Sequence, residues 1–506
     1  MSPKLVVSSQ FDFDRVDFSK ESDVNLDVSL TAPEQEGQKR IPLHIILAID
    51  VSGSMSGNKL DSVKSTANKL LDHVTENDTV GVIAFSETAF DVVQPLPMNT
   101  SNRDAARTAI QNLHTLGSTN IEAALISALE KASNAGKDQV SRIVLLSDGR
   151  PNVGNSTPER LIGIPAQMTK SVSLSTFGYG NDYDPELLAS MSSAGRGNHF
   201  YIQNDGDCRN AFALELGGLL SLYAQDIKVT LTMSGTVAVD EFLSGYDVTQ
   251  SVGYRGITGG KLTFTVPDIF AGEKKHALLR LKVPSASEAV CARQTKVCDI
   301  TVDYLDVESK ARVEATGVVK IQYSKPGKVA TAPNKEVHDQ LFMIEAAKKQ
   351  AEAKKKIETG DITGARVLLQ EAQLWSSGSS AENAGLVASN FSNLLSNTNS
   401  MQDYRLSGSK MFTAYGTSYV TARSASSDTM GLSYLSKRQK SVVADFGSNN
   451  GMGALATGAP GMGNTVSGVS VTSSGTLNGV VSNSIITTTG TVETKKSKSK
   501  KDKKQA

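Results

Sequence analysis

A short apolar run that leads into alternating carboxylate and hydroxyl residues constrains the fold of this chain more than any other feature. Residues 45–49 are continuously apolar, as a strand covered on both faces of a parallel sheet should be. They lead into Asp50-Val51-Ser52-Gly53-Ser54, and residues 57–74 then carry apolar side chains at helical spacing. The D-x-S-x-S triplet therefore falls between the carboxyl end of a strand and a helix, where open α/β sheets bind ligands.

Two further segments offer polar groups of the same kind. Residues 117–120 read Gly-Ser-Thr-Asn before a helix rich in Ala and Leu, and residues 143–149 are another buried-strand pattern that ends in a carboxylate. Hydroxyl, carboxylate and water oxygens in octahedral geometry suit Mg²⁺, and Ca²⁺ or Mn²⁺ can use similar ligands. Taken alone, Asp50 or Ser54 is as readily explained as the N-cap of the following helix. The three segments together predict a divalent metal site.

In this order and spacing, the three segments resemble the von Willebrand factor type A (VWA) domain with an intact metal-ion-dependent adhesion site. The resemblance implies that Ser52, Ser54 and Thr119 contact the metal through their hydroxyls, and that Asp50 and Asp148 bind it directly or through water. It implies Mg²⁺ as the ion, with Mn²⁺ or Ca²⁺ as alternatives.

Mostly neutral ligands leave a bound cation with much of its positive charge, which favours a carboxylate supplied by a partner protein. We find no nucleophile-elbow, H-E-x-x-H or phosphate-loop motif, so we expect a metal-dependent protein-interaction module and no enzyme. The alternative is an adaptor or regulatory subunit of a ubiquitin-ligase or ATPase machine. A third hypothesis is an adhesion or matrix protein that leaves the cell by an unconventional route.

Composition limits the classes of partner and the cellular compartment that we expect for this chain. The 52 Lys and Arg residues balance the 52 Asp and Glu residues, so no global charge predicts a nucleic-acid partner. Three cysteines suit a reducing compartment, and the chain shows neither a secretory signal pattern nor an apolar stretch of membrane-spanning length. We therefore expect a cytoplasmic protein. The basic tail, residues 495–506, is a solvated charge run by default, with contact to an anionic membrane or to nucleic acid as the alternative.

The patterns along the chain predict an α/β, doubly wound VWA domain that is inserted in or joined to an antiparallel β-sandwich, followed by a helical region and a disordered tail. Residues 1–38 contain strands expected to join the sandwich. The VWA domain is placed at residues 41–223, the sandwich at 226–323, the helical region at 333–446 and a low-complexity, disordered segment at 447–506.

Many intracellular VWA proteins, including plant RING-type ubiquitin ligases, look similar in the segments that flank the domain. This chain lacks a RING-like Cys/His cluster, so ligase activity does not carry over. In the helical region, the turn at residues 358–361 predicts either a plain helical hairpin packed on the sandwich or one unit of a helical-hairpin repeat.

Overall fold

The computed structural model describes residues 3–447, except for 35–40, 137, 170–171, 236, 253–258, 292, 329–331 and 422–435. The disordered segment and basic tail predicted at the end of the chain lie outside the described residues, apart from Gly447. No helix in the described part is both long and apolar enough to cross a membrane.

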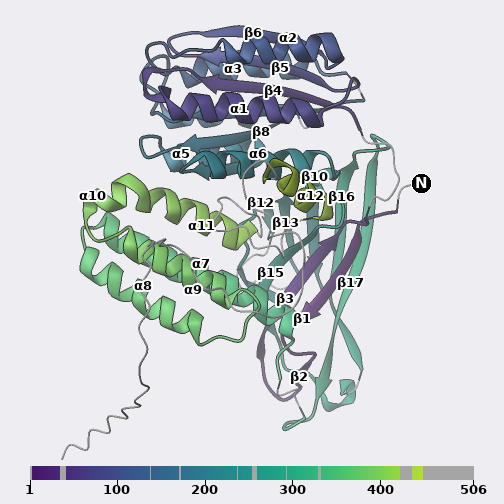
Figure 1. Cartoon of the computed structure of the whole chain (residues 1–506). Coiled ribbons are helices and arrows are strands. Elements are labelled where there is room, and N and C mark those ends of the chain that lie inside the picture. Colours follow the sequence, from purple (N-terminus) through teal and green to yellow (C-terminus); the bar gives the residue numbers. More distant parts are fainter. Residues whose placement is uncertain are drawn as a thin grey trace, which may run out of the picture. The chain divides into compact units, whose positions relative to one another are not determined.

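A six-stranded sheet, in the order β6-β5-β4-β7-β8-β9, forms the predicted α/β domain (Figure 1). Its strands are parallel except β6, which runs antiparallel at one edge. The strands are β4 (Leu43–Asp50), β5 (Thr79–Phe85), β6 (Ala89–Pro97), β7 (Val140–Ser147), β8 (Val172–Tyr179) and β9 (Arg196–Ile202). Strands β4, β5, β7 and β8 are buried along their whole length, which explains the apolar runs within β4, β5 and β7, whereas β8 alternates apolar residues with the buried Ser173 and Ser175.

Helices cover both faces of this sheet, as a doubly wound fold requires. They are α1 (Asn58–His73), α2 (Thr100–Gln111), α3 (Ile121–Ser133), α4 (Pro158–Ala166), α5 (Pro185–Ala194) and α6 (Asp205–Leu219). One hydrophobic core joins α1, α2 and α6 to one face, and a second core joins α3, α4 and α5 to the other. The predicted doubly wound domain is therefore confirmed.

Two further sheets contain the N-terminal strands together with strands from the second half of the chain. The first has the order β1-β3-β15-β11, with bounds Val6–Phe11, Ser22–Thr31, Lys274–Val283 and Ala238–Phe242. The second has the order β12-β13-β10-β16-β17-β2, with bounds Val248–Val252, Lys261–Val266, Leu222–Met233, Gln294–Asp306, Arg312–Ser324 and Arg15–Asp17, and β14 (Ile269–Phe270) pairs with β10.

The two sheets share one hydrophobic core, so the chain before β4 and the chain after α6 fold together, and the α/β domain is inserted between them in the sequence. Strand β3 lies between β1 and β15 and pairs with both in antiparallel register. The expectation of purely antiparallel pairing is wrong at one place, because β2 pairs with β17 in parallel.

Strand β3 provides a direct test of this shared core. Leu26 in β3 is fully buried, and Leu26→Ala is expected to lower the free energy of unfolding by about 2–5 kcal/mol, since it leaves a cavity between the sheets. Val6 in the neighbouring strand β1 is 57% exposed, so Val6→Ala should change the free energy by less than about 0.5 kcal/mol. Chemical denaturation of both variants checks this, and equal stabilities would contradict the shared core.

The C-terminal helices are α7 (Lys335–Glu358), α8 (Ile362–Ser377), α9 (Ala384–Ser396), α10 (Met401–Asp403), α11 (Ser409–Thr421) and α12 (Lys437–Gly447). The sequence predicts that the hairpin of α7 and α8 packs on the β-sandwich, but most of its buried apolar residues share a hydrophobic core with the α/β domain. Residues of α7, α8, α9 and α11 share the hydrophobic core on the α3–α5 face of the α/β domain, and α11 contacts both α5 and β9 (Figure 1). Helix α7 also contacts β3 and β15, so it lies against both parts of the fold. Helix α12 packs on α6, on the opposite face.

Candidate metal site

The predicted site residues lie at the point where the strand order of the α/β sheet reverses. Strand β4 has β5 on one side and β7 on the other, so the connections from β4 and from β5–β6 leave in opposite directions. Parallel sheets open a crevice at the carboxyl ends of their strands at such a switch point. Asp50 is the last residue of β4, and Asp148 directly follows the last residue of β7.

Asp50 organises the loop that follows β4. Its side chain is fully buried, with one oxygen accepting a hydrogen bond from the backbone N–H of Ser52 at 2.8 Å and the other accepting from the Ser147 hydroxyl at 2.6 Å. Burial raises the pKa of Asp50 to about 6, although these hydrogen bonds act in the opposite direction. The N-cap of α1 is Gly57, so the alternative that Asp50 or Ser54 caps this helix is wrong.

The two serines and Asp148 form a continuous chain of hydrogen bonds. The hydroxyl oxygens of Ser52 and Ser54 lie 3.0 Å apart, and the Ser54 hydroxyl donates to Oδ1 of Asp148 at 2.7 Å. Asp148 and Ser52 are buried, whereas Ser54 is exposed. The polar groups therefore run from the sheet interior out to the solvent.

Thr119 comes to the same place from the loop before α3. Asn152 holds its backbone from both sides, because the Asn152 side chain accepts from the Thr119 N–H at 2.8 Å and the Asn152 N–H donates to the Thr119 carbonyl at 3.0 Å. A Cβ atom added to Gly149 would lie 3.2 Å from Oγ1 of Thr119 and 3.7 Å from Oγ of Ser54. The hydroxyls of Thr119 and Ser54 therefore face the bare Cα of Gly149.

These observations fit a small divalent cation. The structure brings the five predicted side chains to one edge of the sheet, and all of them offer the hard oxygen ligands that Mg²⁺ prefers. Two of them are fully buried carboxylates, Asp50 and Asp148, whose burial favours a positive charge nearby, and Lys59 supplies one beside Asp148. Glycine at position 149 leaves room beside the hydroxyls that a larger residue would take.

Sequence reasoning missed four residues that build the site. Ser147 supports Asp50, Asn152 holds Thr119, Gly149 leaves space, and Lys59 forms an ion pair with Asp148. The signal for Ser147 and Gly149 was present in the Ser-Asp-Gly sequence after the apolar run. Lys59 and Asn152 contact residues 89 and 33 positions away in the chain, which no local pattern reveals.

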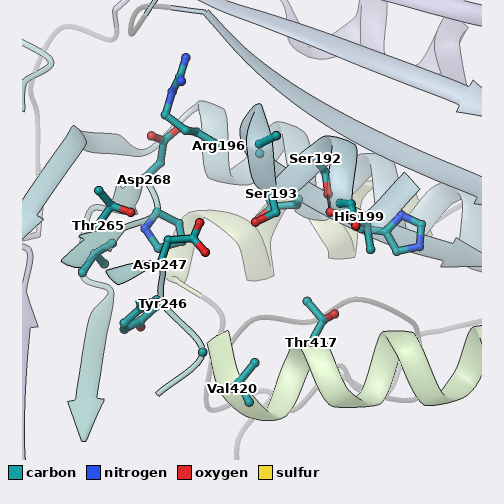
Figure 2. A pocket seen from close by; sticks show the side chains of 18 of the residues that line it. Ser192, Ser193, Arg196, His199, Tyr246, Asp247, Thr265, Asp268, Thr417 and Val420 are labelled. Carbon is teal, nitrogen blue, oxygen red and sulfur yellow. Dashed lines mark hydrogen bonds between the residues drawn. The ribbon is translucent and has the colours of Figure 1, made fainter. Parts of the chain in front are cut away.

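A cavity of about 530 Å³ lies between α5, β9 and the strands of the second sheet, with Thr417 and Val420 of α11 on its rim (Figure 2). Two of its buried polar side chains, Asp268 and His199, already have partners. Asp268 accepts from Arg142 at 2.9 Å, and Nδ1 of His199 lies 2.9 Å from the Thr176 hydroxyl. Burial lowers the pKa of His199 to about 4, so this imidazole is neutral at physiological pH. We regard the cavity as a weaker candidate than the switch-point site.

A cluster of Asp27, His276 and Glu336 is a rival place for a cation, since ligand atoms from the three residues lie within 4.8 Å of one another. Nδ1 of His276 lies 2.7 Å from Asp27, and Glu336 is also held by Lys274 and by the Gln10 amide at 3.1 Å. These contacts join α7 to β3 and β15. The cluster is therefore explained as a set of structural contacts between these elements.

Comparison with known proteins agrees with the fold of the α/β domain. Residues 44–212 match the family model of the von Willebrand factor type A domain. Among curated proteins, the uncharacterized protein sll0103 of Synechocystis is 31% identical over 187 residues, which are 37% of this chain and 44% of that protein. The human inter-alpha-trypsin inhibitor heavy chain H4 is 26% identical over 51% of this chain and 28% of its own length. The matches thus span less than half of either relative.

Two solved structures share the fold over most of the chain. A von Willebrand factor type A protein from Catenulispora acidiphila aligns with a TM-score of 0.62 at 16% identity, and covers 84% of this chain and 98% of its own. The ArnB paralog VWA2 from Sulfolobus acidocaldarius aligns with a TM-score of 0.51 at 15% identity, covering 84% and 99%. Domains of the family commonly bind a divalent cation. Residues 44–212 of this chain are a von Willebrand factor type A domain.

Proposed function

We propose that the VWA domain is a metal-dependent docking module that binds an acidic residue of a partner protein. The convergence of Asp50, Ser52, Ser54, Thr119 and Asp148 at the switch point carries this proposal. A divalent cation held there is positively charged and can bind one more oxygen ligand. Mg²⁺ fits the donor set, and Mn²⁺ can replace it.

The residues of the chain divide this work among them. The buried carboxylates of Asp50 and Asp148 supply negative charge from the sheet side, and each is held in place by a serine hydroxyl. The hydroxyls of Ser52, Ser54 and Thr119 add oxygen ligands without adding charge. The two carboxylates together can therefore at most balance the two positive charges of the cation. Ser54 is exposed, so the site is accessible from solvent on that side. A carboxylate that arrives from that side gains a charge-assisted contact that a neutral amide cannot make.

Affinity purification with the full chain as bait tests this function. Proteins retained in Mg²⁺ but released by EDTA, and absent when Asp148→Ala is the bait, are the expected partners. For a partner identified in this way, changing its contacting Asp or Glu to the amide should weaken binding by at least about tenfold, because the geometry is kept while the charge is lost. A principal partner that binds equally well in EDTA and to Asp148→Ala would contradict the proposal.

The adaptor role in a ubiquitin-ligase or ATPase machine stays a prediction. The same purification addresses it, since the metal-dependent partner would then include a subunit of such a machine.

A further inference from the structure

Lys59 lies beside the candidate metal site and already occupies one of its carboxylates. It is the second residue of α1, and its ammonium group forms an ion pair with Oδ2 of Asp148. The other oxygen of the same carboxylate accepts the hydrogen bond from Ser54. Asp148 is fully buried and the Lys59 side chain is 27% exposed, so the lysine reaches this carboxylate from a partly exposed position.

The position of Lys59 is unfavourable for the helix by itself. The N-terminus of a helix carries a partial positive charge, so a cation in the first turn is disfavoured there. Lys59 nevertheless lies in this turn, and its side chain passes over Gly180, where an added Cβ would come within 3.4 Å of the lysine Cε and 3.5 Å of Nζ. Such a local conflict between sequence and structure is typical of a functional position.

We propose that Lys59 is a built-in counter-ion that competes with the divalent cation for Asp148. This inference rests on the proposed function, because it assumes that a cation binds at this site. In the metal-free protein, the ammonium group compensates the buried carboxylate and stabilises the domain. When a cation binds, the two positive charges share one carboxylate and repel each other. Lys59 therefore lowers the affinity for the metal and keeps the metal-free form folded.

A hollow next to the site gives the lysine another position. A cavity of about 630 Å³ is lined by Lys59 together with Asn58, Gly180, Asp182 and Asp205. Asp182 and Asp205 are exposed carboxylates, so the long and flexible lysine side chain can leave Asp148 and remain near negative charge. The Lys59 side chain can therefore move away from Asp148 when the metal binds, without leaving its charge buried and unpaired.

Calorimetric titration of Mg²⁺ and Mn²⁺ into the metal-free full chain tests the competition. Lys59→Met removes the charge while keeping most of the length, and it should bind either ion about tenfold more tightly than the wild type. Lys59→Arg keeps the charge and should stay within about threefold of the wild type. Lys64→Met is the matched control, because Lys64 lies on the same helix and its nearest carboxylate is the exposed Asp61 at 4.0 Å.

Thermal unfolding gives a second readout that does not depend on a partner. In EDTA, Lys59→Met should melt at a lower temperature than the wild type, since Asp148 loses its counter-ion. In saturating Mg²⁺, its melting temperature should rise by more than that of the wild type, because tighter binding stabilises the folded state further.

The outcomes separate this inference from the proposed function. A wild type that binds metal while Lys59→Met binds equally or more weakly overturns the competition and makes Lys59 a positioning residue for Asp148. If neither the wild type nor Lys59→Met binds Mg²⁺ or Mn²⁺, the proposed function fails as well. Binding by Lys59→Met alone would support the competition, but it would contradict the proposed function, because the wild type itself must hold the metal to bind a partner.

Discussion

Replacing Arg142 with Ala is expected to lower the free energy of unfolding by about 3–5 kcal/mol. Arg142 extends from β7 and is 1% exposed. Its Nη2 lies 2.9 Å from Asp268, and its Nε lies 3.3 Å from Glu215 of α6, as an ion pair without hydrogen-bond geometry. Both carboxylates are themselves buried, so the substitution removes a positive charge that offsets two negative charges in the protein interior.

This interaction connects the α/β domain to the loop between β13 and β14, so its loss should destabilise both parts of the fold. Arg160→Ala is the matched control, since Arg160 pairs with Glu122 but its side chain is 45% exposed, and the expected loss is below about 1 kcal/mol. Urea denaturation of the wild type and both variants measures the difference. An Arg142→Ala protein within about 1 kcal/mol of the wild type would show that the buried ion pairs do not hold the two parts together.

Thr119→Val is expected to weaken the binding of Mg²⁺ by about 100-fold or more, because it removes one hydroxyl ligand while keeping the shape of the side chain. Thr119 is 3% exposed, and its backbone is held by Asn152, so the fold should remain intact. The increase in melting temperature on adding Mg²⁺ measures the effect, since stabilisation by a ligand follows its affinity.

Thr88→Val serves as the control for this substitution, because Thr88 is an exposed threonine on the neighbouring loop between β5 and β6. It should keep the Mg²⁺-dependent rise in melting temperature. If Thr119→Val keeps this rise as well, Thr119 is not a ligand, and the site would have to be built without it.

The α/β domain could be predicted because its signals are local. Buried parallel strands such as β4 and the second half of β7 appear as apolar runs, and helices such as α1 appear as a 3.6-residue pattern. The polar residues of the site then follow from chain position, since the carboxyl ends of β4 and β7 must meet at one edge of the sheet. The helix expected at residues 57–74 is α1, Asn58–His73, which is one residue shorter at each end. The sheet edge formed by β6 was harder to predict from the sequence. Strand β6 contains Pro95 and Pro97 and was not predicted, since proline in a strand is tolerated mainly at a sheet edge.

The packing between distant segments could not be read from the sequence. The apolar faces of α7, α8, α9 and α11 predict that these helices are covered, but a face that fits a sheet of strands also fits the α5 side of the α/β domain. The parallel pairing of β2 with β17 joins segments about 300 residues apart and spans only three residues of β2. Lys59 is missed for the same reason, since a lysine in a helical pattern is most simply explained as solvent-exposed.

Anomalous diffraction from crystals of the full chain soaked in Mn²⁺ tests the central claim most directly, because it locates the ion. We expect one strong peak in contact with the hydroxyl oxygens of Ser52, Ser54 and Thr119, at about 2.0–2.3 Å as for Mg²⁺-like coordination. A peak at Asp27, His276 and Glu336 with none at the end of β4, or no peak at saturating Mn²⁺, would contradict the metal site and the docking function built on it.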